Sequence, residues 1–356
     1  MRMQWIWKSR RSLQNVFIRR SSQYHKPFWR RPLPATLLGC AVLGVAAVYF
    51  AKPSPIDENY PRSVAKYLHE ALYRQKGENN HDFQDAWKAY QSAIKQAESE
   101  KMDMESPPVQ GIRLQMANLL ASAGALHKAW SMYWDILERT SKLPDFLEQR
   151  VLIASKLIEL SEPLGLQKDA TKAADLIVKA LLSKQFNGDD EQKSRLFEQS
   201  ATLYFQAGTP SYAVPLYHEA LNLTMANPSC HGLILMNNLA TSLLAQTETV
   251  DKKHHETLMK QSQSWSQKAV DSYYFAYPKD RNQECHAGCA AAFYTLGQIA
   301  ERQGNIDLAL KHYKNSEALR KDDPYNDGSM LSHIAIDRLD KDAFIKKLDK
   351  SSSPTD

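Results

Sequence analysis

The stretch FYTLGQIAERQGNIDLALKHYKNS, residues 293–316, decides the fold of this chain. Its apolar residues recur with helical spacing on both sides of Gly304, which marks a turn. Small residues stand where two antiparallel helices would cross, at Gly297 and Ala309. Tyr313 is placed to fill the next layer of side chains between the stacked helices. The stretch therefore predicts a hairpin of two α-helices.

The same offsets between small and aromatic residues recur twice upstream, in residues 113–136 and 197–220. Three copies with one internal spacing indicate a repeat protein, and the spacing is that of the tetratricopeptide repeat (TPR), which has a helix A and a helix B per unit. The residues that define the copies are Ala117, Gly124, Ala129, Tyr133, Ala201, Gly208, Ala213, Tyr217, Leu296, Gly297, Gly304, Ala309 and Tyr313.

Three looser copies lie around these, over residues 61–93, 154–180 and 239–275. The second has a lengthened turn at 162–168, and the third has a polar loop at 246–256 before a helix over 259–275. A last helix over about 329–348 is expected to cap the open end. The sequence thus predicts an all-α fold: a TPR-like superhelix of about six helix pairs over residues 60–348, forming one domain.

The first 52 residues differ from the rest in charge, because they hold 10 of the 45 Lys/Arg and no Asp or Glu. Residues 33–51 are apolar, and about 1.5 Å per residue gives them roughly 28 Å, enough to cross a bilayer. We therefore predict a basic mitochondrial targeting segment at 1–32, a transmembrane helix at 33–51, a linker at 53–59 and a disordered tail at 349–356. A secretory signal anchor is the alternative.

By the positive-inside rule, the N-terminus should lie in the matrix and the repeat domain in the intermembrane space. Without residues 1–52 the chain has 35 basic and 40 acidic groups, a net charge of −5. The overall charge of +5 therefore comes from the targeting segment and does not favour nucleic-acid binding.

Motifs for catalysis or cofactor binding are missing from the sequence. It has no glycine-rich phosphate loop, no G-x-S-x-G elbow and no zinc-binding His-Glu-x-x-His. The His254-His255 pair falls in the predicted polar loop, where a solvated pair is favoured over a metal site. We expect neither an enzyme nor a metal or cofactor site.

Three cysteines lie in the repeat region, Cys230, Cys285 and Cys289. Cys230 and Cys285 both open helix A of adjacent units, so in an oxidising compartment Cys230 could bridge to Cys285 or Cys289. A bridge between Cys285 and Cys289, within one helical turn, has poor geometry. The favoured interpretation is that all three are small buried residues at helix crossings.

Positions 2, 5, 9 and 12 of helix A line the inner surface of a TPR unit. Here that surface would be neutral to acidic with aromatic contacts, and it lacks the Lys/Arg set that would clamp a C-terminal carboxylate. An extended or partly unfolded polypeptide is the expected guest; the alternative is a row of merely solvated side chains. The candidate residues are Asn118, Glu198, Thr202, Phe205, Asn237, Thr241, Tyr294, Gln298 and Glu301.

Four stretches, 60–73, 111–117, 284–290 and 293–301, together resemble the fungal mitochondrial inner-membrane TPR proteins that act as adaptors of the i-AAA protease. The Cys-x3-Cys run before Leu296-Gly297 is the most specific part. The resemblance implies a single-pass inner-membrane protein facing the intermembrane space. It would bind unfolded membrane or intermembrane-space proteins and deliver them to the protease for degradation, without a catalytic residue of its own.

The expected partners are therefore AAA protease subunits, unfolded client polypeptides and the bilayer, through one span. Two alternatives remain on the same fold. One is an assembly factor for an inner-membrane respiratory complex, and the other is an outer-membrane import receptor whose repeats face the cytosol.

Overall fold

The structure is a computed structural model that describes residues 55–76, 80–224, 229–276, 281–320 and 327–351. This part of the chain is all-α, as the sequence predicts, and holds no β-strand. The predicted targeting segment and the predicted span at 33–51 lie outside the described residues. Among the helices that are described, none combines the length and apolarity needed to cross a bilayer.

The helices fall into two compact units, which we call the N-terminal unit, up to Phe186, and the C-terminal unit, from Asn187. The N-terminal unit contains α3 (Pro55–Asn59), α4 (Arg62–Gln75), α5 (Asn80–Ser99), α6 (Pro107–Ser122), α7 (Leu126–Arg139), α8 (Leu147–Leu164) and α9 (Thr171–Leu182), with 3-10 turns at Thr140–Lys142 and Pro144–Phe146. The C-terminal unit contains α10 (Asp190–Gln206), α11 (Pro210–Thr224), α12 (Cys230–Gln246), α13 (Lys252–Asp271), α14 (Gln283–Arg302), α15 (Ile306–Leu319) and α16 (Asp327–Ser351).

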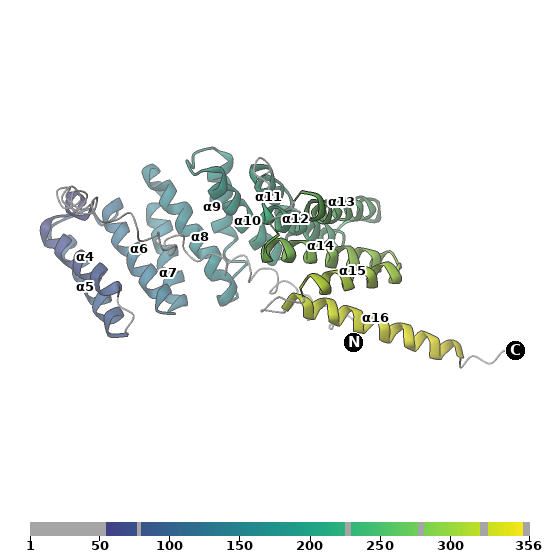
Figure 1. Ribbon diagram of the computed structural model, residues 1–356. Coiled ribbons are helices and arrows are strands. Elements are labelled where there is room, and N and C mark those ends of the chain that lie inside the picture. Colours follow the sequence, from purple (N-terminus) through teal and green to yellow (C-terminus); the bar gives the residue numbers. More distant parts are fainter. Residues whose placement is uncertain (1–54, 77–79, 225–228, 277–280, 321–326, 352–356) are drawn as a thin grey trace, which may run out of the picture. The chain divides into compact units, whose positions relative to one another are not determined.

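Successive helices pack in pairs along each unit (Figure 1). The pairs are α4–α5, α6–α7 and α8–α9 in the N-terminal unit, and α10–α11, α12–α13 and α14–α15 in the C-terminal unit. The predicted number of about six helix pairs is therefore confirmed within the described residues. That these pairs form one superhelical domain stays a prediction.

Glycines close the turns between the helices of the three clearest pairs. Gly124, Gly208 and Gly304 have φ of 77°, 85° and 79°. This left-handed conformation costs a residue with a Cβ atom energy but costs glycine little, so glycine ends helix A and turns the chain into helix B.

The interior of each pair combines small residues with one large ring. Ala117, Ala129 and Tyr133 are at most 1% exposed where α6 crosses α7. In α14 the missing side chain of Gly297 makes room for the ring of Tyr313, because a Cβ there would lie 2.5 Å from Tyr313 Cε1. The small residues of the repeat pattern thus allow two helix backbones to approach closely around the tyrosine.

One helix begins earlier than the sequence predicts. α13 starts at Lys252 rather than at 259, because Asp251 caps it by accepting a hydrogen bond from the backbone N–H of His254 across 3.0 Å. The prediction failed there because the first two turns carry polar side chains and show no apolar period. Met259 is the first buried apolar residue of that helix.

Other boundaries differ by smaller amounts. The predicted helix 259–275 changes to a π-helical turn over Ser272–Ala276. Residues 55–59, assigned to a linker, form the short helix α3. Residues 349–351, assigned to the tail, belong to α16. Residues 352–356 lie outside the described part.

Candidate binding surface

The inner-surface candidates of the C-terminal unit divide into half-buried and buried residues. Those that keep part of their surface open are Thr202, Phe205, Thr241, Tyr294, Gln298 and Glu301. Glu198 and Asn237 are 8% and 2% exposed. These two side chains therefore serve contacts between helices and are not available to an incoming guest.

Asn237 belongs to a hydrogen-bonded group that joins α12 to α14. Thr295 Oγ1 donates to Asn237 Oδ1 across 2.9 Å and lies 3.4 Å from Thr241 Oγ1. Asn237 and Thr295 are both buried, and the hydrogen bond between them offsets part of the free-energy cost of removing their polar atoms from water.

Glu198 belongs to a cluster of three residues from three A helices, which we call the ion cluster. His231, in α12, lies with Nε2 2.8 Å from Glu198 Oε2 of α10, and with Nδ1 3.2 Å from Glu284 Oε1 of α14. Ionised carboxylates only accept hydrogen bonds, so both ring nitrogens must carry a proton. The contacts therefore require a positively charged imidazolium between two carboxylates.

Electrostatics support that assignment. Burial by itself lowers the pKa of His231, but the charges and hydrogen bonds of Glu198 and Glu284 outweigh burial and raise this pKa to about 10. The imidazolium therefore persists at neutral pH and neutralises acidic charge on the inner surface.

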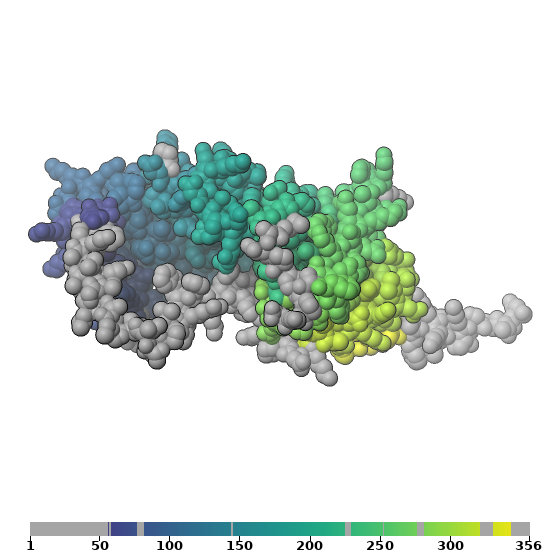
Figure 2. Space-filling model, turned by 45° about the horizontal axis from the view of Figure 1, so that its top comes forward, coloured from purple at the N-terminus to yellow at the C-terminus, as the bar shows by residue number. Residues whose placement is uncertain are grey.

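A second carboxylate of the inner surface is neutralised by the last helix. Arg338 of α16 donates two hydrogen bonds to Glu301 of α14, each across 2.7 Å, and the hydroxyl of Tyr313 donates to the same carboxylate across 3.0 Å. Figure 2 shows the yellow surface of α16 lying directly against the green surface of the helices before it. The predicted cap thus closes the unit and occupies one of the inner-surface acids.

The candidate in the N-terminal unit, Asn118, is also engaged. Its Oδ1 accepts a hydrogen bond from the hydroxyl of Tyr133 across 2.7 Å. Thr202 and Tyr217 make the matching contact in the C-terminal unit, across 2.8 Å. In these two pairs position 9 of helix A therefore binds the repeat tyrosine of helix B, whereas in α14–α15 the repeat tyrosine binds Glu301, at position 12.

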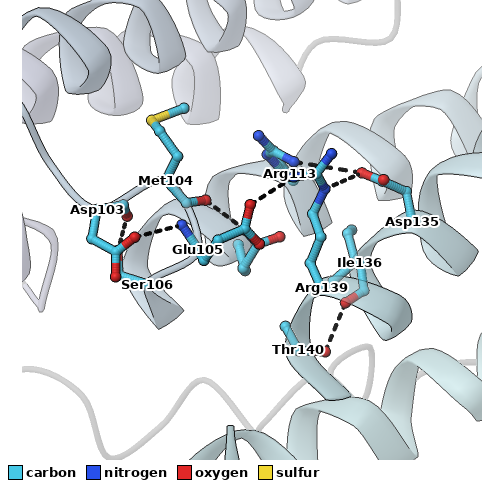
Figure 3. A network of polar contacts seen from close by, with 10 residues as sticks. Asp103, Met104, Glu105, Ser106, Arg113, Asp135, Ile136, Arg139 and Thr140 are labelled. Carbon is cyan, nitrogen blue, oxygen red and sulfur yellow. Dashed lines mark hydrogen bonds and ion pairs between the residues drawn. The ribbon is translucent and has the colours of Figure 1, made fainter. Parts of the chain in front are cut away.

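A network of polar contacts orders the connection between α5 and α6 in the N-terminal unit (Figure 3). Arg139 of α7 contacts Glu105 across 2.6 Å and Asp135 across 2.8 Å. Arg113 of α6 lies 3.5 Å from Asp135. The side chains of Glu105, Asp135 and Arg139 are 37–48% exposed, so this network holds the connection in place and adds little stability.

The cysteines lie at one edge of the C-terminal unit. Cys230 and Cys285 form a disulfide with a Cα–Cα distance of 4.5 Å, and Cys289 is a free, buried thiol. All three pack in one apolar cluster with Leu233, Tyr273 and Phe293, among others. The structure therefore has one of the two bridges that the sequence left open, in place of the favoured arrangement of three unlinked thiols.

The described residues offer a hollow for a small ligand but no cluster of metal-binding side chains. They hold no group of three or more His, Cys, Asp or Glu side chains arranged for a metal ion. One shallow hollow of about 520 Å³ lies between α5, α6 and α7 of the N-terminal unit. It is lined by Trp87, Leu120, His127, Lys128, Ser131, Met132 and Asp135.

The solved structures that resemble this chain share little sequence identity with it, and no protein-family model matches it. YrrB, described as a TPR protein with an unusual peptide-binding site, is 18% identical over 68% of this chain and 97% of its own, with a TM-score of 0.44. BtubC from P. vanneervenii is 17% identical over 73% of this chain and 90% of its own, with a TM-score of 0.41. MamA is 14% identical over 60% of this chain and 92% of its own, with a TM-score of 0.42.

These TM-scores lie below 0.5, so the assignment rests on the helix pairs, their glycine turns and their buried tyrosines. The chain has a TPR-like repeat fold. Stacked helix pairs of this kind present extended surfaces on which other proteins bind, and protein–protein interaction is the general role of such a fold.

Sequence reasoning missed the ion cluster and the hollow beside Trp87. No spacing rule links Glu198, His231 and Glu284, which come from three different repeats. The only local signal is that His231 follows Cys230 and Glu284 precedes Cys285, so the two polar residues flank the two bonded cysteines.

Proposed function

We propose that the chain is a membrane-anchored adaptor that binds unfolded segments of mitochondrial membrane and intermembrane-space proteins and delivers them to the i-AAA protease. In this proposal residues 33–51 anchor the chain in the inner membrane, with the N-terminus in the matrix and the repeats in the intermembrane space. The chain has no catalysis of its own and acts by holding client and protease together. Tethering in one membrane raises their effective concentration without new contacts.

The observation that supports this proposal best is the internal pairing of the acids on the A-helix surface of the C-terminal unit. Glu198 and Glu284 are paired with His231, and Glu301 is paired with Arg338. The half-buried residues that face a guest are Thr202 and Thr241, whose hydroxyls already contact Tyr217 and Thr295, the amide of Gln298, and the rings of Phe205 and Tyr294. Such a surface suits a polypeptide held by apolar contacts and backbone hydrogen bonds, without a required charge.

Binding of a permanently unfolded polypeptide, such as a reduced and carboxymethylated protein, tests the surface directly. Because these acids are paired inside the protein and the ion cluster keeps a net charge of only −1, raising NaCl from 50 to 500 mM should change the dissociation constant less than about threefold. Phe205→Ala and Tyr294→Ala should each weaken binding about tenfold. Phe275→Ala is the matched control, because this ring is 83% exposed and lies in the π-helical turn that follows α13, outside the candidate residues of the A helices. A strong salt dependence, or equal loss in the control, would refute this binding mode.

Partner and location need experiments in mitochondria. Affinity capture of the full chain should recover an AAA protease; recovery of respiratory-complex subunits without the protease would support the assembly factor instead. The repeats should resist added protease in intact mitochondria and be digested once the outer membrane is ruptured. Digestion in intact organelles would support the import receptor. Release of the chain by carbonate extraction would remove the membrane anchor from the proposal.

A further inference from the structure

Two different links join α12 and α14 at the same edge of the C-terminal unit. Cys230, the first residue of α12, is bonded to Cys285 of α14. One residue along, His231 pairs with Glu284 across 3.2 Å. A covalent link and an ionic link therefore lie side by side between the same two helices.

The ionic link is part of a larger assembly, whereas the disulfide is not. His231 also contacts Glu198 of α10, so the ion cluster connects three A helices. Breaking the disulfide changes the charge of none of these side chains. The charges that hold the three helices together therefore do not depend on the covalent bond.

The third cysteine does not compete for the bond. Cys289 is fully buried, and burial raises the pKa of its thiol to about 12 although the nearby charge of Arg281 acts in the opposite direction. The attacking species in thiol–disulfide exchange is the thiolate, which this site suppresses at neutral pH. Cys230 and Cys285 therefore have one stable pairing.

We propose that Cys230 and Cys285 form a reversible redox latch across α12 and α14, and that the ion cluster of Glu198, His231 and Glu284 keeps the reduced helices in register so that the latch closes again. Oxidation links the two sulfurs and releases two protons and two electrons. A low-molecular-weight disulfide accepts them and is cleaved to two thiols. A dithiol reductant reverses the reaction.

Counting thiols tests the bond itself. The full chain, purified in mild detergent and treated with oxidised glutathione, should show two alkylated cysteines after denaturation in iodoacetamide, Cys40 and Cys289. All four cysteines of the chain should react after dithiothreitol. Proteolytic peptides should join Cys230 to Cys285. Four reactive thiols after oxidation, or a bridge to Cys289, would overturn the latch.

Stability and local opening test its mechanical effect. The bond closes a sequence separation of 55 residues, and loop-closure entropy predicts a Tm about 10 °C lower in the reduced chain. Amide exchange in the first turns of α12 and α14 should quicken at least tenfold. Cys230→Ser should abolish both responses, and Cys289→Ser should keep them. Identical behaviour of the oxidised and reduced chains would refute the proposal.

The rate of closure tests the ion cluster. Reduced, folded His231→Ala should re-form the bond with oxidised glutathione at least fivefold more slowly than the wild-type chain, because the two cysteines are less well aligned. Glu284→Gln, which keeps the shape and loses the charge, is the second variant if the first does not fold. His254→Ala is the matched control at an exposed Asp–His pair. If both cluster variants re-oxidise at the wild-type rate, the ion cluster does not keep α12 and α14 in register. None of these readouts needs a client or a protease, so they fail or succeed independently of the adaptor function.

Discussion

The hydroxyl of Tyr133 donates a hydrogen bond to Oδ1 of Asn118, fifteen residues earlier, across 2.7 Å. The same separation joins Tyr90 to Gln75 across 2.6 Å and Tyr217 to Thr202 across 2.8 Å. In each case the repeat tyrosine of helix B reaches a polar side chain of helix A in the same pair. Burial raises the pKa of Tyr90 and Tyr133 to about 12, so these phenols remain protonated and able to donate.

Tyr133→Phe removes one hydroxyl and leaves the ring in place. Asn118 Oδ1 then loses its partner in a half-buried position, which should lower the free energy of unfolding by about 1–2 kcal/mol. Urea denaturation followed by circular dichroism measures the change. Tyr73→Phe is the control, because Tyr73 is 76% exposed and should change stability by less than about 0.5 kcal/mol. Equal effects of the two substitutions would argue against the tyrosine contact.

Gly297→Ala adds one methyl group at the crossing of α14 and α15. The new Cβ would lie 2.5 Å from Cε1 and 2.7 Å from Cδ1 of Tyr313, a ring that is 1% exposed and has no room to move away. We expect a loss of about 2–3 kcal/mol, measured as a lower Tm.

Gly232→Ala, in the same unit, should stabilise the protein where Gly297→Ala destabilises it. Gly232 is buried in α12, and a Cβ there would meet no atom within 4 Å. Because alanine favours the helix by about 0.5–1 kcal/mol over glycine, this change should raise the Tm. Destabilisation at both positions would mean that close packing at Gly297 is not the cause.

His231→Ala should remove a pH dependence. The pKa of His231 is raised from 6.5 to about 10 in the folded chain, so the ion cluster contributes fully below about pH 6.5 and loses its contribution as pH rises to about 10. At pH 6 the variant leaves the buried Glu198 without its cation, and we expect a loss of about 3 kcal/mol. The difference in unfolding free energy between the wild-type chain and His231→Ala should shrink towards pH 10. The same comparison with His254→Ala, at an exposed pair with Asp251, should stay below about 1 kcal/mol at pH 6.

Arg139→Ala removes the centre of the polar network in Figure 3. Its partners Glu105 and Asp135 are about half exposed, so water screens these charges. The expected cost is below about 1 kcal/mol at 50 mM NaCl and falls further at 0.5 M. A larger cost that persists in high salt would show that the arginine contributes through packing.

The repeat architecture could be predicted because its determinants are local. Gly124, Gly208 and Gly304 stand at fixed offsets from the alanines and tyrosines of the same pair, and within the described residues each has a left-handed φ. The start of α13 could not be predicted by the same rule. The cap at Asp251 makes α13 begin two turns earlier, and the residues of those two turns are polar, so no spacing of apolar residues predicts them.

The candidate surface was predicted in part. Helix A positions 2, 5, 9 and 12 were identified from the repeat, but the sequence could not tell half-buried Thr202 and Tyr294 from buried Glu198 and Asn237. Exposure at those positions depends on which side chain of the neighbouring repeat lies opposite. His231 covers Glu198, and Thr295 covers Asn237, each from a different repeat.

By itself the sequence determined the helix pairs, their turns and the small residues at the crossings, because each is set by spacing within about thirty residues. Only the tertiary structure decided that Cys230 bonds to Cys285, that Glu198 and Glu284 share His231, and that Arg338 neutralises Glu301. Those partners are separated by 33 to 55 residues along the chain. Stacking of the repeats brings them together, and no local period records which side chains then meet.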